Sequence, residues 1–99
     1  MNDERIPEKF LPLGTVCILK NAYKRVMITG FLIAGQEDNK RYDYMGCMYP
    51  EGILETDQIL VFNHSQIKSV VFLGFDDAER KLLNKRLMDI EKALDSKAS

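Results

Sequence analysis

Several features that carry chemistry in other proteins are scarce in this sequence of 99 residues. It contains one histidine and two cysteines, and Cys17 and Cys47 do not have the spacing of metal ligands. We therefore expect no zinc site and no other cofactor. No apolar run approaches the roughly 18–20 residues that span a bilayer. The N-terminal stretch MNDERIPEK lacks the basic and apolar regions of a signal peptide, so we expect a cytoplasmic protein without membrane insertion.

The sequence also lacks an excess of charge of either sign. Fourteen basic and fifteen acidic side chains give a formal net charge of −1. A broad non-specific surface for nucleic acid normally shows a basic excess, so the composition argues against a surface of that kind. A net charge near zero leaves little self-repulsion, which permits association with other proteins.

The two cysteines allow one disulfide bond by number alone. Both lie in apolar stretches that we predict to be strands, and no export signal accompanies them. Buried free thiols are typical of proteins in a reducing compartment. We therefore expect Cys17 and Cys47 to be reduced.

A chain of this length forms one domain. Residues 1–9 are polar and are predicted to be a flexible arm, and residues 10–96 are predicted to be a single small domain. Apolar and β-branched runs between turn residues predict five strands, at about 15–20, 25–34, 41–49, 58–62 and 67–73. Gly30 within the second run predicts a bulge or a sharp bend. Residues 35–40 are predicted to form a hairpin loop.

From residue 76 onward the apolar pattern changes to that of a helix. Leu83, Leu87, Ile90 and Leu94 are spaced 4, 3 and 4 residues apart, which predicts an amphipathic helix over about residues 77–94. The short connections require antiparallel strands. The predicted fold is mainly β, in the α+β class. It is a five-stranded antiparallel SH3-like small barrel or strongly bent sheet, with one C-terminal helix over an open end or face.

Residues 42–52 (YDYMGCMYPEG) concentrate the side chains that have chemistry to offer, including three of the four tyrosines. Alternation along a strand places Tyr42 and Tyr44 on one face and Tyr49 on the other. Pro50 and Gly52 then predict a turn. Part of this segment is therefore expected to serve packing and geometry, and the remainder is a candidate surface.

The sequence contains no combination of residues that strongly indicates catalysis. Cys47 or Cys17 with His64 is the only conceivable cysteine–histidine pair, but apolar surroundings raise the pKa of a thiol and make it inert. Glu51 and Glu55 have no spacing that requires an acid–base pair. We therefore expect that the protein is not an enzyme.

A stacking surface for single-stranded nucleic acid is the alternative function. Small barrels bind such strands on an aromatic face ringed by basic side chains, and Tyr42 and Tyr44 could form that face. The candidate basic ring consists of Lys24, Arg25, Lys40 and Arg41. The net charge argues against this reading, and the rigid amphipathic ring of tyrosine suits protein interfaces equally well.

Three fragments, LPLGTVCILKN, YDYMGCMYPEG and VFNHSQIKSVVFLGF, carry a resemblance to a known family. Over about residues 10–78 the chain resembles small domains of uncharacterised function from Gram-positive bacteria. Members of that family are encoded in type VII secretion loci, beside LXG-domain toxins and small helical partner proteins. The main departures are Cys17 and Cys47, where the family pattern has aliphatic residues.

The resemblance implies a cytoplasmic accessory protein that binds a toxin substrate, keeps it soluble and helps to target it for secretion. It implies no catalytic residues. We therefore expect a chaperone or targeting adaptor whose partner is an LXG-type toxin or one of its small helical partners. The candidate partner surface consists of Tyr42, Tyr44, Tyr49, Pro50 and Glu51.

Overall fold

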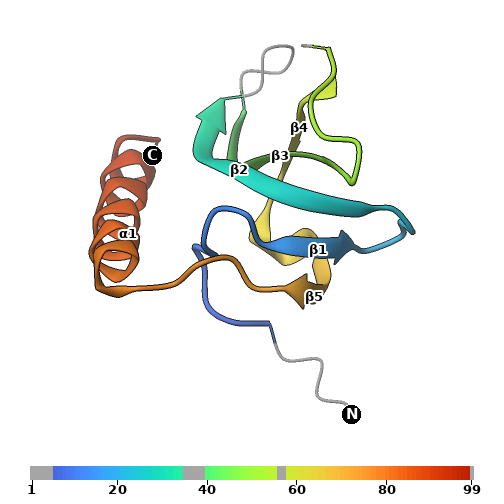
Figure 1. Cartoon of the computed structure of the whole chain (residues 1–99). Helices are drawn as coiled ribbons and strands as arrows, with labels where there is room; N and C mark the ends of the chain where they lie inside the picture. The colour runs from blue at the N-terminus through green and yellow to red at the C-terminus, as the bar shows by residue number, and fades with distance from the viewer. Residues whose placement is uncertain (1–5, 35–39, 56–57, 99) are drawn as a thin grey trace.

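The computed structural model describes residues 6–34, 40–55 and 58–98 (Figure 1). Within these residues five strands precede one α-helix. The elements are β1 (Val16–Leu19), β2 (Arg25–Ala34), β3 (Arg41–Tyr49), β4 (Leu60–Phe62), a 3-10 turn (His64–Gln66), β5 (Ile67–Phe72) and α1 (Ala78–Ala98). The predicted hairpin loop, apart from Lys40, lies outside the described residues, as does the predicted arm up to residue 5.

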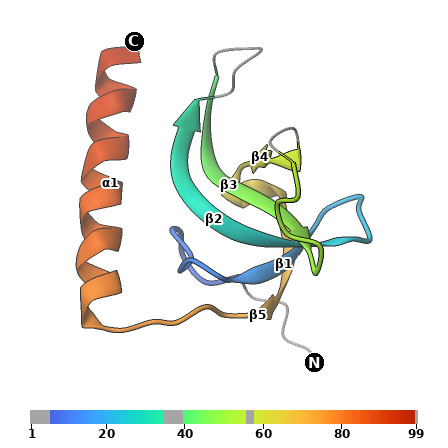
Figure 2. The same ribbon diagram turned by 45° about the horizontal axis from the view of Figure 1, so that its top comes forward.

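The five strands form one antiparallel sheet in the order β4-β3-β2-β1-β5. The prediction of a mainly β fold with five antiparallel strands and one C-terminal helix is confirmed. The sheet is strongly bent and is not closed, because β4 and β5 remain its two edges. Figure 2 shows β2 and β3 curving together around the interior.

The bend in β2 has a local cause. Ile28 and Gly30 pair with consecutive residues of β3, which leaves Thr29 without a partner in the ladder. An extra residue of this kind increases the twist of a strand and lets it turn a corner. The prediction of a bulge or bend at Gly30 is therefore confirmed.

The core fills the inside of this bend and is centred on an aromatic ring. The Tyr44 ring lies 6.0 Å from that of Phe10 and 5.4 Å from that of Phe62, measured between centroids. All three side chains are buried. Burying each such side chain contributes about 1.5–3 kcal/mol, so residues from before β1, from β3 and from β4 hold the open sheet in its bent form.

The chain before residue 10 also belongs to the packed body where the structure describes it. The Lys9 ammonium lies 3.3 Å from the Asp43 carboxylate and 2.6 Å from that of Glu91. Ile6 packs against the core. The segment from residue 6 therefore links the sheet to α1.

The helix begins and ends later than predicted. The Asp77 carboxylate accepts a hydrogen bond from the Arg80 backbone N–H at 2.9 Å, which caps the first turn and starts α1 at Ala78. The far end is held by an ion pair between Arg41 and Asp95, and the helix continues to Ala98. No helix in the described part of the chain is long and apolar enough to cross a membrane.

An extended segment after β5 carries the chain to α1, which stands to one side of the curved β2 (Figures 1 and 2). Gly74 lies in this segment, and its N–H donates to the Thr15 hydroxyl at 3.0 Å. A Cβ on residue 74 would collide with the Leu13 carbonyl oxygen. Glycine is required because the two backbones touch here.

Candidate protein-binding surface

The five residues predicted to form the partner surface do not form one surface. Tyr44 is fully buried, and its hydroxyl is used inside the fold. It accepts the Leu11 N–H at 3.1 Å and lies 2.8 Å from His64 Nδ1. Tyr44 therefore belongs to the core rather than to a partner surface, because the bend of the sheet turns its face inward.

Tyr42 and Tyr49 lie at opposite ends of β3. Tyr42 pairs with Ile33, near the end of β2, whereas Tyr49 pairs with Arg25, at its start. Seven residues of strand separate the two tyrosines by roughly 23 Å, and alternation places them on opposite faces of the sheet. Only Tyr49 continues into the Pro50–Glu51 turn.

The corner formed by Tyr49, Pro50 and Glu51 is exposed and is braced by the start of β2. The Lys24 ammonium lies 2.7 Å from the Glu51 carboxylate, and the Arg25 guanidinium lies over the Tyr49 ring, 5.0 Å from its centroid. The ion pair with Lys24 holds the pKa of Glu51 below its usual value. The corner is thus a preformed surface of aromatic and paired charged groups.

The basic side chains considered for nucleic acid are divided between the two ends of the β2–β3 ladder. Arg25 pairs with Tyr49 at one end, and Ala34 pairs with Arg41 at the other. Arg41 is also neutralised by Asp95 on α1. The basic ring predicted around an aromatic face is therefore absent from the described residues, because its members lie roughly 30 Å apart along β2.

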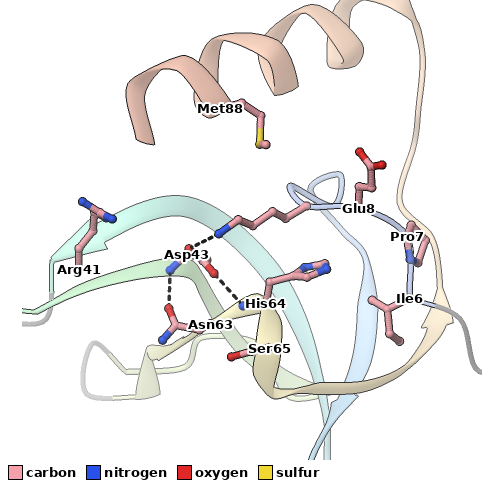
Figure 3. Close-up of a pocket in the computed structure, with 10 residues that line it drawn as sticks. Ile6, Pro7, Glu8, Arg41, Asp43, Asn63, His64, Ser65 and Met88 are labelled. Atoms are coloured by element: carbon pink, nitrogen blue, oxygen red, sulfur yellow. Dashed lines mark hydrogen bonds and ion pairs between the residues drawn. The ribbon is translucent and has the colours of Figure 1, made fainter. Parts of the chain in front are cut away.

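A polar pocket lies where α1, the segment before β1 and the 3-10 turn meet (Figure 3). Its centre is Asp43, whose carboxylate accepts the His64 backbone N–H at 2.9 Å and the Lys9 ammonium at 3.3 Å. The Asp43 N–H in turn donates to the Asn63 side-chain oxygen at 3.0 Å. Burial of such a carboxylate is tolerated because it is paired and hydrogen-bonded.

His64 points from the 3-10 turn toward Pro7 in this pocket (Figure 3). In the neutral tautomer that carries its proton on Nε2, His64 Nδ1 accepts a hydrogen bond from the Tyr44 hydroxyl at 2.8 Å. The same tautomer leaves the Nε2 hydrogen free to donate to the Pro7 backbone, an interaction that raises the pKa of His64. Burial lowers the pKa of His64 below its usual value, and the opposing charges of Asp43 and Lys9 modify this shift. The neutral imidazole therefore has a structural use at both nitrogens.

The remaining chemical candidates are similarly occupied or enclosed. Cys17 and Cys47 are both free and buried, and burial raises the pKa of Cys17 to about 11. Glu51 is bound to Lys24 at the exposed corner, away from His64. Among the residues that the structure describes, no group of three His, Cys, Asp or Glu side chains is placed to hold a metal ion. The arrangement around Asp43 joins the segment before β1, β3, the 3-10 turn and α1.

The exposed apolar side chains form two hollows that the sequence analysis did not identify. The first, the sheet hollow, has a volume of about 380 Å³ and lies on the outer face of the sheet. It is lined by Gly14, Val16, Arg25, Met27, Tyr49, Val71 and Phe72. Pairing places Phe72, Val16 and Met27 side by side across three strands. Tyr49 therefore lines an apolar hollow, and most of the other residues of this hollow come from β1, β2 and β5.

The second hollow, the helix groove, has a volume of about 470 Å³ and lies between α1 and the body of the protein. It is lined by Leu13, Phe31, Phe75, Asp77, Glu79, Arg80 and Leu83. The segment Val71, Phe72, Leu73 and Phe75 runs between the two hollows with all four side chains exposed. A signal for this surface was present in the sequence, since residues 70–73 (VVFL) are continuously apolar where a half-buried strand would alternate.

Comparison with known proteins identifies the family of the chain. No curated protein and no solved structure matches it significantly. The model of one family matches residues 10–83, which cover every strand and the first turn of α1. The chain therefore belongs to the family described as Domain of unknown function (DUF4176).

Proposed function

We propose that this protein is a non-enzymatic accessory protein that binds a protein partner through its exposed apolar surface. The proposed partner is an LXG-type toxin of a type VII secretion system. In this role the protein is a cytoplasmic chaperone or targeting adaptor for the toxin. The type VII context comes from the family resemblance of residues 10–78, and the surface supplies the physical reason for a protein partner.

The observation that carries this proposal is the exposure of the segment Val71, Phe72, Leu73 and Phe75. Isolated exposed apolar side chains are common, but contiguous exposed patches rimmed by polar groups mark interaction sites. Here four large side chains from five consecutive positions lie on the surface and join two apolar hollows. Covering them with a partner would remove from water an area that the fold itself leaves open.

The exposed corner at Tyr49 supports the same function. Tyr49 lines the sheet hollow together with Phe72, and its ring is held by the Arg25 guanidinium. Aromatic and arginine side chains are enriched among the residues that dominate binding energy at protein interfaces. The corner is therefore proposed as the polar and aromatic margin of the apolar surface.

Co-expression with an LXG toxin of a type VII secretion system, the proposed partner, tests the proposal. Soluble toxin and secreted toxin are measured with the wild type, with Phe72→Ser and with the control Leu54→Ser. Both substitutions remove an exposed apolar side chain, but Leu54 lies outside both hollows. We expect toxin solubility and secretion to require the protein and to fall with Phe72→Ser only. Unchanged toxin solubility and secretion in the absence of the protein would refute the proposed function.

A further inference from the structure

The helix α1 meets the body of the protein along a face that is mostly polar. Among its described side chains only Leu87 is buried, and the half-buried ones are Arg80, Asn84, Met88 and Glu91. Steps of three and four residues along this set place its members on one side of the helix. Helices of soluble proteins normally bury an apolar stripe against their own domain, so α1 docks with less apolar contact than is usual.

The first half of α1 is attached through the backbone of one residue. The Arg80 guanidinium donates to the Phe10 carbonyl at 2.9 Å, and the Phe10 N–H donates to the Asn84 side-chain oxygen at 2.7 Å. Within the described residues, only the backbones of neighbouring strands run close together along their lengths. The helix therefore rests largely on the chain before β1 and not on the face of the sheet.

The second half of α1 is attached through two ion pairs. The Glu91 carboxylate lies 2.6 Å from the Lys9 ammonium, which also lies 3.3 Å from the Asp43 carboxylate of β3. Asp95 pairs with Arg41 at the start of β3. Polar contacts at positions 80, 84, 91 and 95 thus hold the helix along its length, and the last two depend on charge.

The chain that receives α1 is itself fixed firmly to the sheet. Phe10 and Leu11 are each 1% exposed, and the Leu11 N–H donates to the Tyr44 hydroxyl at 3.1 Å. Lifting this chain would open the aromatic core, whereas lifting α1 would withdraw one buried side chain, Leu87. The weaker boundary in the molecule therefore runs between α1 and the chain before β1.

The connection to α1 has a fixed point followed by a short irregular stretch. Gly74 is buried and its N–H is bound to the turn before β1, so the chain is anchored there. Residues 75–77 belong to neither a strand nor a helix, and Figure 2 shows α1 rising from the end of this segment. Asp77 caps the helix by accepting the Arg80 N–H. The cap belongs to the helix itself and does not depend on contact with the body.

We propose that α1 is a lid that opens as a unit while the bent sheet stays folded. The lid turns about residues 75–77, breaks its contacts with Phe10, Lys9 and Arg41, and uncovers the side of the core on which Leu87 packs. Local opening below the global free energy of unfolding is characteristic of elements with few buried apolar contacts. This inference goes beyond the proposed function and does not rest on it.

Hydrogen–deuterium exchange of the full-length chain at several urea concentrations tests the lid. We expect the protection factors of residues 84–95 to be about a hundredfold or more below those of β2 and β3. They should share one dependence on urea that is weaker than that of the sheet, because opening the lid exposes less surface than unfolding. Equal protection of helix and sheet would show one cooperative unit, and protection that falls steadily toward residue 98 would show fraying. Either result overturns the inference.

Two variants of α1 separate docking from the stability of the helix itself. Glu91→Gln and Asp89→Asn each remove one acidic charge from the same turn, but Glu91 reaches Lys9 whereas Asp89 is exposed. We expect Glu91→Gln to lower the protection factors of residues 84–95 about fivefold to tenfold and to leave those of β2 and β3 unchanged. Asp89→Asn should change them less than about threefold.

Lys9→Met removes the same ion pair from the other side. It should lower the protection of residues 84–95 as Glu91→Gln does, and the double variant should lose little more, since one contact is removed in both cases. Equal effects of Glu91→Gln and Asp89→Asn, or an equal loss of protection in β2 and β3, would overturn the inference. The proposed function would remain intact, because it depends on the exposed segment after β5.

Discussion

Tyr44 shows how a single residue joins distant parts of this fold. Its ring packs on Phe10 and Phe62, while its hydroxyl bonds to the Leu11 backbone and to His64. These partners lie before β1, in β4 and in the 3-10 turn. A buried hydroxyl with two partners is costly to remove, because each partner then loses its hydrogen bond without access to water.

Replacement of this hydroxyl gives a direct prediction. Tyr44→Phe should lower the free energy of unfolding by about 1–3 kcal/mol, because the Leu11 N–H and His64 Nδ1 lose their partner. Tyr23→Phe is the matched control, since Tyr23 is fully exposed, and it should have an effect below about 0.5 kcal/mol. Urea unfolding of the two variants measures the difference. Equal stability of the two variants would contradict the buried network.

The lowered pKa of His64 is expected to make the free energy of unfolding depend on pH. Burial lowers its pKa in the folded state, so the unfolded chain binds a proton more readily as the pH falls through about 6.5. The contribution of neutral His64 to the free energy of unfolding is fully present above this pH. It is lost as the pH falls toward the pKa of His64 in the folded state. His64 is the only histidine, and no other side chain ordinarily titrates in this window.

We therefore expect the free energy of unfolding of the wild type to decrease between pH 7.5 and pH 6, within the window about the histidine reference pKa. His64→Gln should be less stable at pH 7.5, but its stability should change less over the same interval. Urea unfolding at several pH values measures the slopes. An identical slope in both proteins would show that the imidazole is not held neutral.

At the scale of elements, a backbone contact holds the β5–α1 segment against the turn before β1. Gly74 makes this contact through its backbone. Gly74→Ala should lower the free energy of unfolding by about 2–3 kcal/mol, because the added methyl group forces two backbones apart.

Gly30→Ala is the comparison for this prediction. A Cβ on residue 30 would come 3.2 Å from the Met45 Cε, and the end of a flexible methionine can move aside. We expect a smaller loss than for Gly74→Ala, measured by thermal unfolding. Equal losses would mean that the backbone contact at Gly74 does not constrain the path to α1.

The elements themselves were largely predictable, because each depends on local pattern. The β-branched runs, Gly30 and the 4-3-4 leucine spacing predicted the strands, the bend and the helix. The side of α1 that meets the body was not predictable. It is decided by Asn84, which bonds to Phe10, and by Glu91, which bonds to Lys9, and these pairs are separated by 74 and 82 positions along the chain.

The candidate site was less predictable for the same reason. Strand alternation correctly separates Tyr44 from Tyr49, but it cannot show which face becomes the interior of a bent sheet. Tyr44 is in the core because Phe10 and Phe62 close over its face. Phe72 joins Tyr49 only through the ordering of β5, β1, β2 and β3 in the sheet, which strand patterns do not specify.

At the scale of the whole molecule, charge and aromatic groups are distributed unfavourably for nucleic acid. Arg25 and Arg41 lie at opposite ends of the β2–β3 ladder, and Tyr44 is buried. We expect no salt-dependent binding of short single-stranded oligonucleotides at low ionic strength, measured by fluorescence anisotropy. Binding that weakens steeply with added salt would instead support the nucleic-acid alternative.

The whole surface also explains why a protein partner is favoured. The sheet hollow and the helix groove each contain exposed apolar side chains, and the exposed segment from Val71 to Phe75 contributes residues to both. The polar pocket around Asp43 and His64 lies elsewhere and has a volume of about 610 Å³, and its walls are joined by internal hydrogen bonds and an ion pair. The molecule thus separates a stabilising polar cluster from an exposed apolar surface.

Hydrogen–deuterium exchange of this protein with and without an LXG toxin, the proposed partner, tests the central claim most directly. We predict that the toxin slows exchange in residues 71–75 and 77–83, and leaves the turn at residues 63–66 unchanged. Protection confined to the turn around His64, or no protection anywhere in the presence of soluble toxin, would contradict the account.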